Sequence, residues 1–134
     1  MKEIITGIFI GDNKDYEENY KDFILCVNCD GEIKPNCLNI KLLQKDNRGF
    51  IRAYMDNEKL IMEKWRKGNI LFFCQTGIHK SCEFSCVIIS KIFNFSIKES
   101  IKLICSKKEN AFEKYYNQIV LWYIDAIKHI YNQD

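Results

Sequence analysis

The sequence predicts one α/β domain over residues 1–134, with helices flanking a central, mostly parallel sheet. The run FILCVN at residues 23–28 is continuously apolar, as strands buried on both faces are. A second predicted strand, residues 69–73, has an apolar run at residues 70–73 and leads through a short glycine-containing turn into a helical pattern. Strand patterns fill the early chain and helical patterns the late chain, and a length of 134 residues fits one core.

The composition excludes several classes of function. Hydrophobic residues make up 47% of the chain and the net charge is +2, so we expect no strong attraction to nucleic acid or anionic membranes. The start lacks the apolar block of a signal peptide, and the apolar run at residues 119–124 is too short to span a bilayer. The bias toward Lys, Asn and Ile suggests the AT-rich coding sequence of some parasites and large DNA viruses.

The seven cysteines follow no disulfide framework, and seven is an odd number. This pattern favours free thiols in a reducing compartment, so we expect a cytoplasmic protein, in the host cytoplasm if it is viral. A zinc site at Cys26, Cys29 and Cys37 is disfavoured because no fourth ligand follows at a suitable spacing. No cofactor is indicated.

The first half of the chain predicts strands and one short helix. Residues 4–11 predict one or two short strands interrupted by glycine, and residues 14–21 predict a charged helix. We expect residues 23–28 to form a central strand and residues 37–43 another. Residues 44–49 predict a polar loop, because all six are polar or glycine.

The second half predicts four helices around one more strand. Apolar residues from Phe50 to Trp65 fall at helical spacing before a stop at Gly68, and residues 81–93 repeat the pattern with Cys82 and Cys86 as core residues. Ser96 begins a capping box and a helix to about residue 105. The last helix is expected to have Asn110 as its N-cap. Its wide apolar stripe begins with Phe112.

The strand-to-helix turn at residues 74–80 predicts an anion site. Backbone N–H groups of such a turn can surround one point, toward which the following helix directs its positive end. Cys74 would lie at the base of this cup, where the surrounding amides favour a thiolate nucleophile. The alternative for Cys74 is a small buried hydrophobe at a strand end.

This stretch, FCQTGIHKS at residues 73–81, resembles the signature loop of the small dual-specificity phosphatases, in the cysteine-based tyrosine-phosphatase superfamily. That signature is His-Cys, five residues, Arg, then Ser or Thr, with glycine third after the cysteine. Cys74, Gly77 and Ser81 match it, whereas Phe73 replaces the histidine and Lys80 the arginine. The order of strands and helices agrees along almost the whole chain. The resemblance therefore implies the family's α/β fold.

The resemblance also implies a two-step mechanism. Cys74 would attack a phosphate ester, Asp46 would protonate the leaving oxygen and then activate water, and Ser81 would hydrogen-bond the sulfur. The phosphate would be bound by the loop residues Gln75, Thr76, Gly77, Ile78, His79 and Lys80. Asp46 lies 28 residues before Cys74, about where the family has its acid, but it also suits an ordinary loop or Asx-turn carboxylate. Asp56 is the weaker acid candidate.

The two departures point to impaired chemistry. Arginine holds two phosphoryl oxygens with a planar fork, whereas lysine is a hydrated point charge on a flexible stem. His79 is mostly neutral at neutral pH, since the ordinary histidine pKa is about 6.5. We therefore expect a pseudophosphatase, or a strongly impaired phosphatase, that binds phosphorylated groups.

Two alternatives remain from the sequence. One is an active cysteine-dependent phosphatase that uses Lys80, and the other is a protein-interaction scaffold that does not depend on the loop. A phosphorylated protein is the first expected partner. An RNA 5′ phosphate and a phosphoinositide present the same phosphate anion, so they are the alternative partners.

Overall fold

The protein folds around a five-stranded sheet, seen in the computed structural model of the chain, which describes residues 1–40, 47–78 and 80–112. The strands are β1 (Lys2–Ile5), β2 (Ile8–Gly11), β3 (Leu25–Asn28), β4 (Leu38–Asn39) and β5 (Ile70–Phe73). Their order across the sheet is β1-β2-β5-β3-β4. Only the β1–β2 pair is antiparallel, so the prediction of a mostly parallel sheet is confirmed.

Both β3 and β5 lie inside the sheet, as the sequence predicts for residues 23–28, and β5 is the middle strand. β5 pairs in parallel with β2 on one side and with β3 on the other. Its four residues are fully buried, because a strand lies on each side of it and a hydrophobic core covers each face of the sheet there. The strand that leads into the candidate loop is therefore the most buried strand of the sheet.

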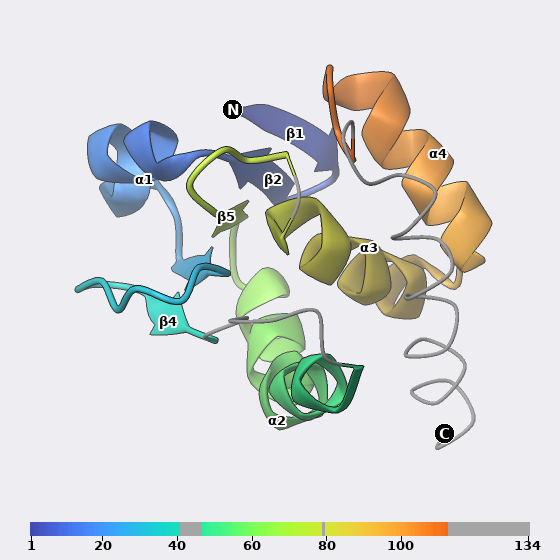
Figure 1. Ribbon diagram of the computed structural model, residues 1–134, viewed down its shortest axis with the longest axis horizontal. Helices are drawn as coiled ribbons and strands as arrows, with labels where there is room; N and C mark the ends of the chain where they lie inside the picture. Colours follow the sequence, from blue (N-terminus) through green and yellow to red (C-terminus); the bar gives the residue numbers. More distant parts are fainter. Residues whose placement is uncertain (41–46, 79, 113–134) are drawn as a thin grey trace.

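Helices cover the two faces unequally. The helices are α1 (Asn13–Asn19), the short 3₁₀ helix η1 (Tyr20–Asp22), α2 (Asn47–Trp65), α3 (Lys80–Phe93) and α4 (Ile97–Lys107). Residues of α2, α3 and α4 pack into the main core with Ile70 and Phe72 of β5 (Figure 1). Alternate residues Leu71 and Phe73 face a smaller core beneath α1. This alternation is the period of two expected of a strand buried on both faces.

Two predicted boundaries are wrong in the middle of the chain. The helix expected to follow a polar loop at residues 44–49 begins earlier, at Asn47, so the end of that loop is helical. The strand expected at residues 37–43 is reduced to two residues, Leu38–Asn39, within the described part. Local polarity misplaced the helix start, because propensity is a weak guide to helix boundaries.

The helices α3 and α4 follow the sequence prediction closely. α3 is buried on almost every side, including the polar residues Ser81, Ser85 and Ser90, so it is the central helix of the layer. Ser96 accepts a hydrogen bond from the N–H of Glu99, whose carboxylate accepts one from the N–H of Ser96. The predicted capping box is therefore confirmed.

The beginning of the predicted last helix is wrong. Asn110 and Phe112 lie in turns with left-handed φ angles of 66° and 63°, whereas an N-cap residue has an extended backbone. Phe112 is nevertheless buried, and its N–H donates to the carbonyl of Ile78 at 2.9 Å. The rest of that helix lies outside the described residues. Among the described helices, none is long and apolar enough to cross a membrane.

Candidate functional site

The loop between β5 and α3 has a conformation set by Gly77. This residue is buried and has a φ of +69°, a region that favours glycine. A Cβ at Gly77 would lie 2.8 Å from the carbonyl carbon and oxygen of Gly11, at the end of β2. The loop is therefore pressed against the neighbouring strand, and the glycine that the sequence singled out is required by both backbone angle and space.

Cys74 lies at the base of this loop, directly after β5. Its side chain is buried, with 2% exposure, and its Sγ is 3.2 Å from the Oγ of the fully buried Ser81 in α3. Either atom can be the donor. The structure thus brings together the two residues that the resemblance pairs, while their chemical roles remain predictions.

Two further thiols surround Cys74. Burial and the nearness of Cys74 raise the pKa of both Cys29, after β3, and Cys82, in α3. The Sγ of Cys82 also donates to the carbonyl of Gly77 at 3.5 Å, so this residue supports the loop as well as the core. Both neighbours remain neutral thiols at physiological pH.

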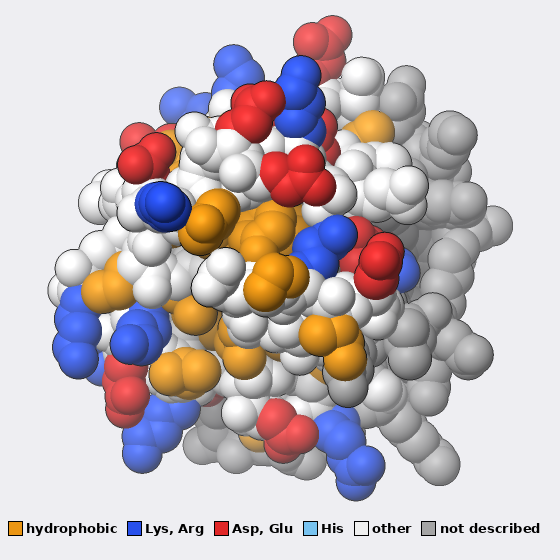
Figure 2. Space-filling view, turned by 90° about the vertical axis from the view of Figure 1, so that its left-hand side faces the viewer, with side chains coloured by type: hydrophobic (Ala, Val, Ile, Leu, Met, Phe, Trp, Pro, Cys, Tyr) orange, Lys and Arg blue, Asp and Glu red, His pale blue; other side chains and the backbone are white. Residues whose placement is uncertain are grey.

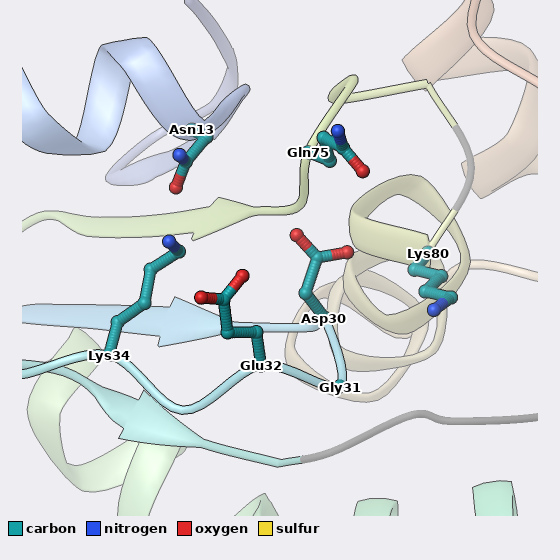
Figure 3. A pocket seen from close by; sticks show the side chains of 7 residues that line it. All are labelled: Asn13, Asp30, Gly31, Glu32, Lys34, Gln75 and Lys80. Atoms are coloured by element: carbon teal, nitrogen blue, oxygen red, sulfur yellow. The ribbon is translucent and has the colours of Figure 1, made fainter.

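Lys80 is the first residue of α3 and lines a pocket of about 270 Å³ beside the loop. Gln75 lines the same pocket, as do residues from the β3–β4 connection and from the start of α1. These additional residues are Asn13, Asp30, Gly31, Glu32 and Lys34 (Figure 3). The pocket therefore contains both signs of charge at the mouth of the candidate loop.

The β3–β4 connection is held in place by two asparagines. The buried Asn28 donates from Nδ2 to the carbonyl of Glu32 and to Oδ1 of Asn39, both at 2.7 Å, and its Oδ1 accepts from the N–H of Asp30 at 2.9 Å. Asn39 bonds to both the N–H and the carbonyl of Lys34, each at 2.9 Å. These bonds fix the backbone that carries the three charged residues.

Phe73, which replaces the signature histidine, faces away from the main core. Its ring stacks on Tyr16 of α1, with centroids 4.3 Å apart and an interplanar angle of 5°. This side chain is fully buried in the smaller core. It contributes packing between β5 and α1 at a position where the family pattern has a polar group.

The structure places the other predicted residues unequally. Gln75 and Thr76 are exposed, and the N–H of Ile78 donates to Oγ1 of Thr76 at 3.3 Å. Asp46 and His79 lie outside the described residues. Asp56 is exposed on α2.

Sequence reasoning missed the carboxylates Asp30 and Glu32. Because β3 and β5 pair in parallel, the C-terminal ends of both strands lie at the same edge of the sheet. The residues after Asn28 therefore lie beside those after Phe73. The motif DGE after a strand was the signal, but it has meaning only once β3 and β5 are known to be neighbours. Within the described residues, no group of three or more His, Cys, Asp or Glu side chains is arranged to hold a metal, and Cys26 and Cys29 belong to separate cores.

Comparison with known proteins gives matches to solved structures. No family model and no curated protein sequence matches the chain. The crystal structure of human DUSP28 matches with a TM-score of 0.80 and 12% identity, over 100% of both chains. A mouse dual specificity phosphatase matches with a TM-score of 0.72 and 13% identity, over 98% of this chain and 89% of that one.

A third match is the human tyrosine phosphatase-like serine/threonine/tyrosine-interacting protein. Its TM-score is 0.64 and its identity 17%, over 96% of this chain and 93% of that chain. At such identities the matches establish architecture, and here they do so over nearly the whole chain. The chain therefore has the fold of the small dual-specificity phosphatases, as the resemblance of its sequence predicts.

Proposed function

We propose that the protein binds phosphorylated groups, first of all phosphorylated proteins, at residues 74–80 and has weak or no phosphatase turnover. The observation that carries this proposal is the conformation of the loop, with Gly77 against Gly11 and the Cys74 thiol in contact with Ser81 at its base. The seven free cysteines support a reducing compartment, and we propose the cytoplasm.

The loop has donors available for an anion. Among the described residues, the backbone N–H groups of Gln75, Thr76 and Gly77 have no hydrogen-bond acceptor. The first turn of α3 adds N–H groups that have no partner within the helix. N–H groups at a loop and helix start favour a tetrahedral oxyanion. One structural neighbour, the mouse dual specificity phosphatase, is described as a complex with zinc tungstate, which contains such an oxyanion.

Lys80 supports binding more than turnover. An ammonium attracts the phosphate dianion but does not fix two of its oxygens as a guanidinium fork does. Losing one such contact in the transition state costs about 3 kcal/mol, on the order of a hundredfold in rate. The loss in binding is smaller, because charge attraction persists.

Titration with phosphate, sulfate and vanadate tests the binding. An anion at ten times its Kd stabilises the folded chain by about 1.4 kcal/mol, which raises the melting temperature by several degrees. Lys80→Ala is expected to weaken binding severalfold, whereas Lys98→Ala, an exposed lysine on α4, is the matched control. An unchanged melting temperature at tens of millimolar anion contradicts both binding and catalysis at this loop.

A working phosphatase is the second candidate, because the 3.2 Å contact between Cys74 and Ser81 suits catalysis as well as binding. An assay with an aryl phosphate separates the two candidates. Wild-type turnover that disappears in Cys74→Ser favours a working enzyme with Cys74 as its nucleophile. Turnover that rises on the order of a hundredfold only in Lys80→Arg indicates an impaired site.

An interaction scaffold that does not depend on the loop is the third candidate. Figure 2 shows hydrophobic side chains gathered at the centre of the face that carries α1 and β4. A second pocket, of about 300 Å³, has a largely apolar lining that includes Phe23, Ile24 and Leu60. This candidate predicts that Cys74→Ser and Lys80→Ala leave partner capture unchanged, so loss of a partner in either variant excludes it.

A further inference from the structure

The pocket beside the loop carries charges that phosphate binding alone does not use. Its volume of about 270 Å³ has room for a ligand group beside the phosphate. Figure 3 shows the carboxylates of Asp30 and Glu32 turned toward the same space, with Lys34 and Lys80 on either side. Each of the four side chains is at least partly exposed.

The two carboxylates are available to a ligand. The ion pairs found among the described residues involve neither carboxylate and neither lysine of the pocket. The hydrogen bonds of Asp30 and Glu32 to Asn28 use backbone atoms only. The β3–β4 connection therefore fixes the backbone of both residues and leaves their carboxylate oxygens unbonded within the described part of the chain.

The balance of charge changes when a phosphate binds. The formal charges of Asp30, Glu32, Lys34 and Lys80 cancel in the empty pocket. A phosphate monoester dianion bound at the loop leaves two negative charges uncompensated. Like charges repel, so a ligand with a positive group beside its phosphate is favoured over one without.

We propose that Asp30 and Glu32 select a phosphorylated protein segment with lysine or arginine next to the phosphorylated residue. This inference rests on the proposed binding of phosphate at the loop. The phosphate binds at the loop of residues 74–80, and the two carboxylates accept hydrogen bonds from the ammonium or guanidinium group of the peptide's lysine or arginine. An RNA 5′ end or a phosphoinositide brings further anionic groups instead, which the two carboxylates oppose.

Binding of matched peptides tests the proposal. Three peptides of equal length carry a central phosphorylated residue flanked by arginine, alanine or glutamate, and each is made with phosphotyrosine and with phosphothreonine. Anisotropy titrations at low and physiological salt are expected to show the arginine peptide binding about fivefold more tightly than the alanine peptide. The glutamate peptide is expected to bind more weakly than both.

The double variant Asp30→Asn/Glu32→Gln is expected to reduce the arginine preference below twofold and to tighten binding of the glutamate peptide. Asp22→Asn/Glu63→Gln is the matched control, because it makes the same charge change at exposed residues that precede β3 and β5, at the opposite edge of the sheet. This control is expected to keep the preference.

The outcomes distinguish phosphate binding at the loop from selection by Asp30 and Glu32. If no phosphopeptide binds, the proposed function fails and the selectivity fails with it. If phosphopeptides bind without a preference for arginine, or the preference survives in Asp30→Asn/Glu32→Gln, the inference fails and the proposed function stands.

Discussion

Gly77 is the residue on which the loop depends most directly. Its φ is left-handed, which disfavours any residue with a side chain, and the nearby Gly11 carbonyl leaves no space for a Cβ. We expect Gly77→Ala to lower the free energy of unfolding by about 2 kcal/mol, from the cost of the left-handed conformation and the displaced strand end. The same shift is expected to weaken anion binding at least tenfold, as measured by urea unfolding and phosphate titration.

Gly68→Ala is the control for this substitution. Gly68 precedes β5 without a left-handed φ, and its Cβ would meet only the side chain of Ile24, at 3.3 Å. A change in unfolding free energy below about 1 kcal/mol and unchanged anion affinity are expected. If Gly77→Ala behaves like Gly68→Ala, the loop is not held as the geometry indicates.

The sequence predicted single residues best where one residue type carries one physical requirement. Gly77 belongs to this class, as does Ser96 with its capping box. Phe73 does not, because its stacking on Tyr16 pairs residues 57 positions apart, which no local pattern reveals. Asp46, the predicted acid, stays a prediction, because it lies outside the described residues.

The connection between β3 and β4 is the element that completes the candidate site. Asn28 is fully buried and makes three hydrogen bonds within this connection. Asn28→Ala removes a hydrogen-bond partner of the Asp30 N–H, the Glu32 carbonyl and the Asn39 Oδ1. We expect this loss to lower the free energy of unfolding by about 2–4 kcal/mol. We also expect this variant to lose the preference for basic phosphopeptides, because Asp30 and Glu32 are no longer held in place.

A second asparagine separates this effect from asparagine substitution in general. Asn57, on the surface of α2, donates to the carbonyl of Ala53 at 2.7 Å, four residues earlier in the same helix. Asn57→Ala is expected to change the unfolding free energy by less than about 1 kcal/mol and to leave peptide preference unchanged. Equal losses in both variants contradict the assigned role of Asn28.

Elements were predicted well from periodicity, but their neighbours in space were not. The run at residues 23–28 was correctly identified as a strand inside the sheet, but the middle position of β5 was not predicted. Strand order depends on how crossover helices pack, and this information is spread over the whole chain. The pocket at the ends of β3 and β5 was missed for the same reason.

The core of the whole molecule is rich in thiols that burial keeps neutral. Burial raises the pKa of Cys26 to about 12, and it raises the pKa of Cys29, Cys82 and Cys86 well above the ordinary value. In the unfolded chain these thiols titrate near their ordinary pKa of about 8.5. Folded and unfolded chains therefore bind equal numbers of thiol protons at neutral pH.

This difference predicts that stability falls in alkaline solution. Above about pH 8.5 the unfolded chain releases thiol protons that the folded chain keeps, so the free energy of unfolding decreases, and for Cys26 the decrease continues to about pH 12. Each buried thiol contributes up to about 1.4 kcal/mol per pH unit once it is ionised in the unfolded chain. Urea unfolding at pH 7, 8, 9 and 10 under reducing conditions measures the slope.

Variants that each remove one cysteine test whether buried thiols cause the fall of the unfolding free energy with pH. Cys86→Ala is expected to remove one thiol's share between pH 9 and pH 10, because the pKa of the buried Cys86 is raised by its burial. Cys105→Ala, at an exposed position, is expected to remove less. A free energy of unfolding that stays constant from pH 8 to pH 10 contradicts the neutral-thiol core, and with it the argument that the thiols surrounding Cys74 remain neutral.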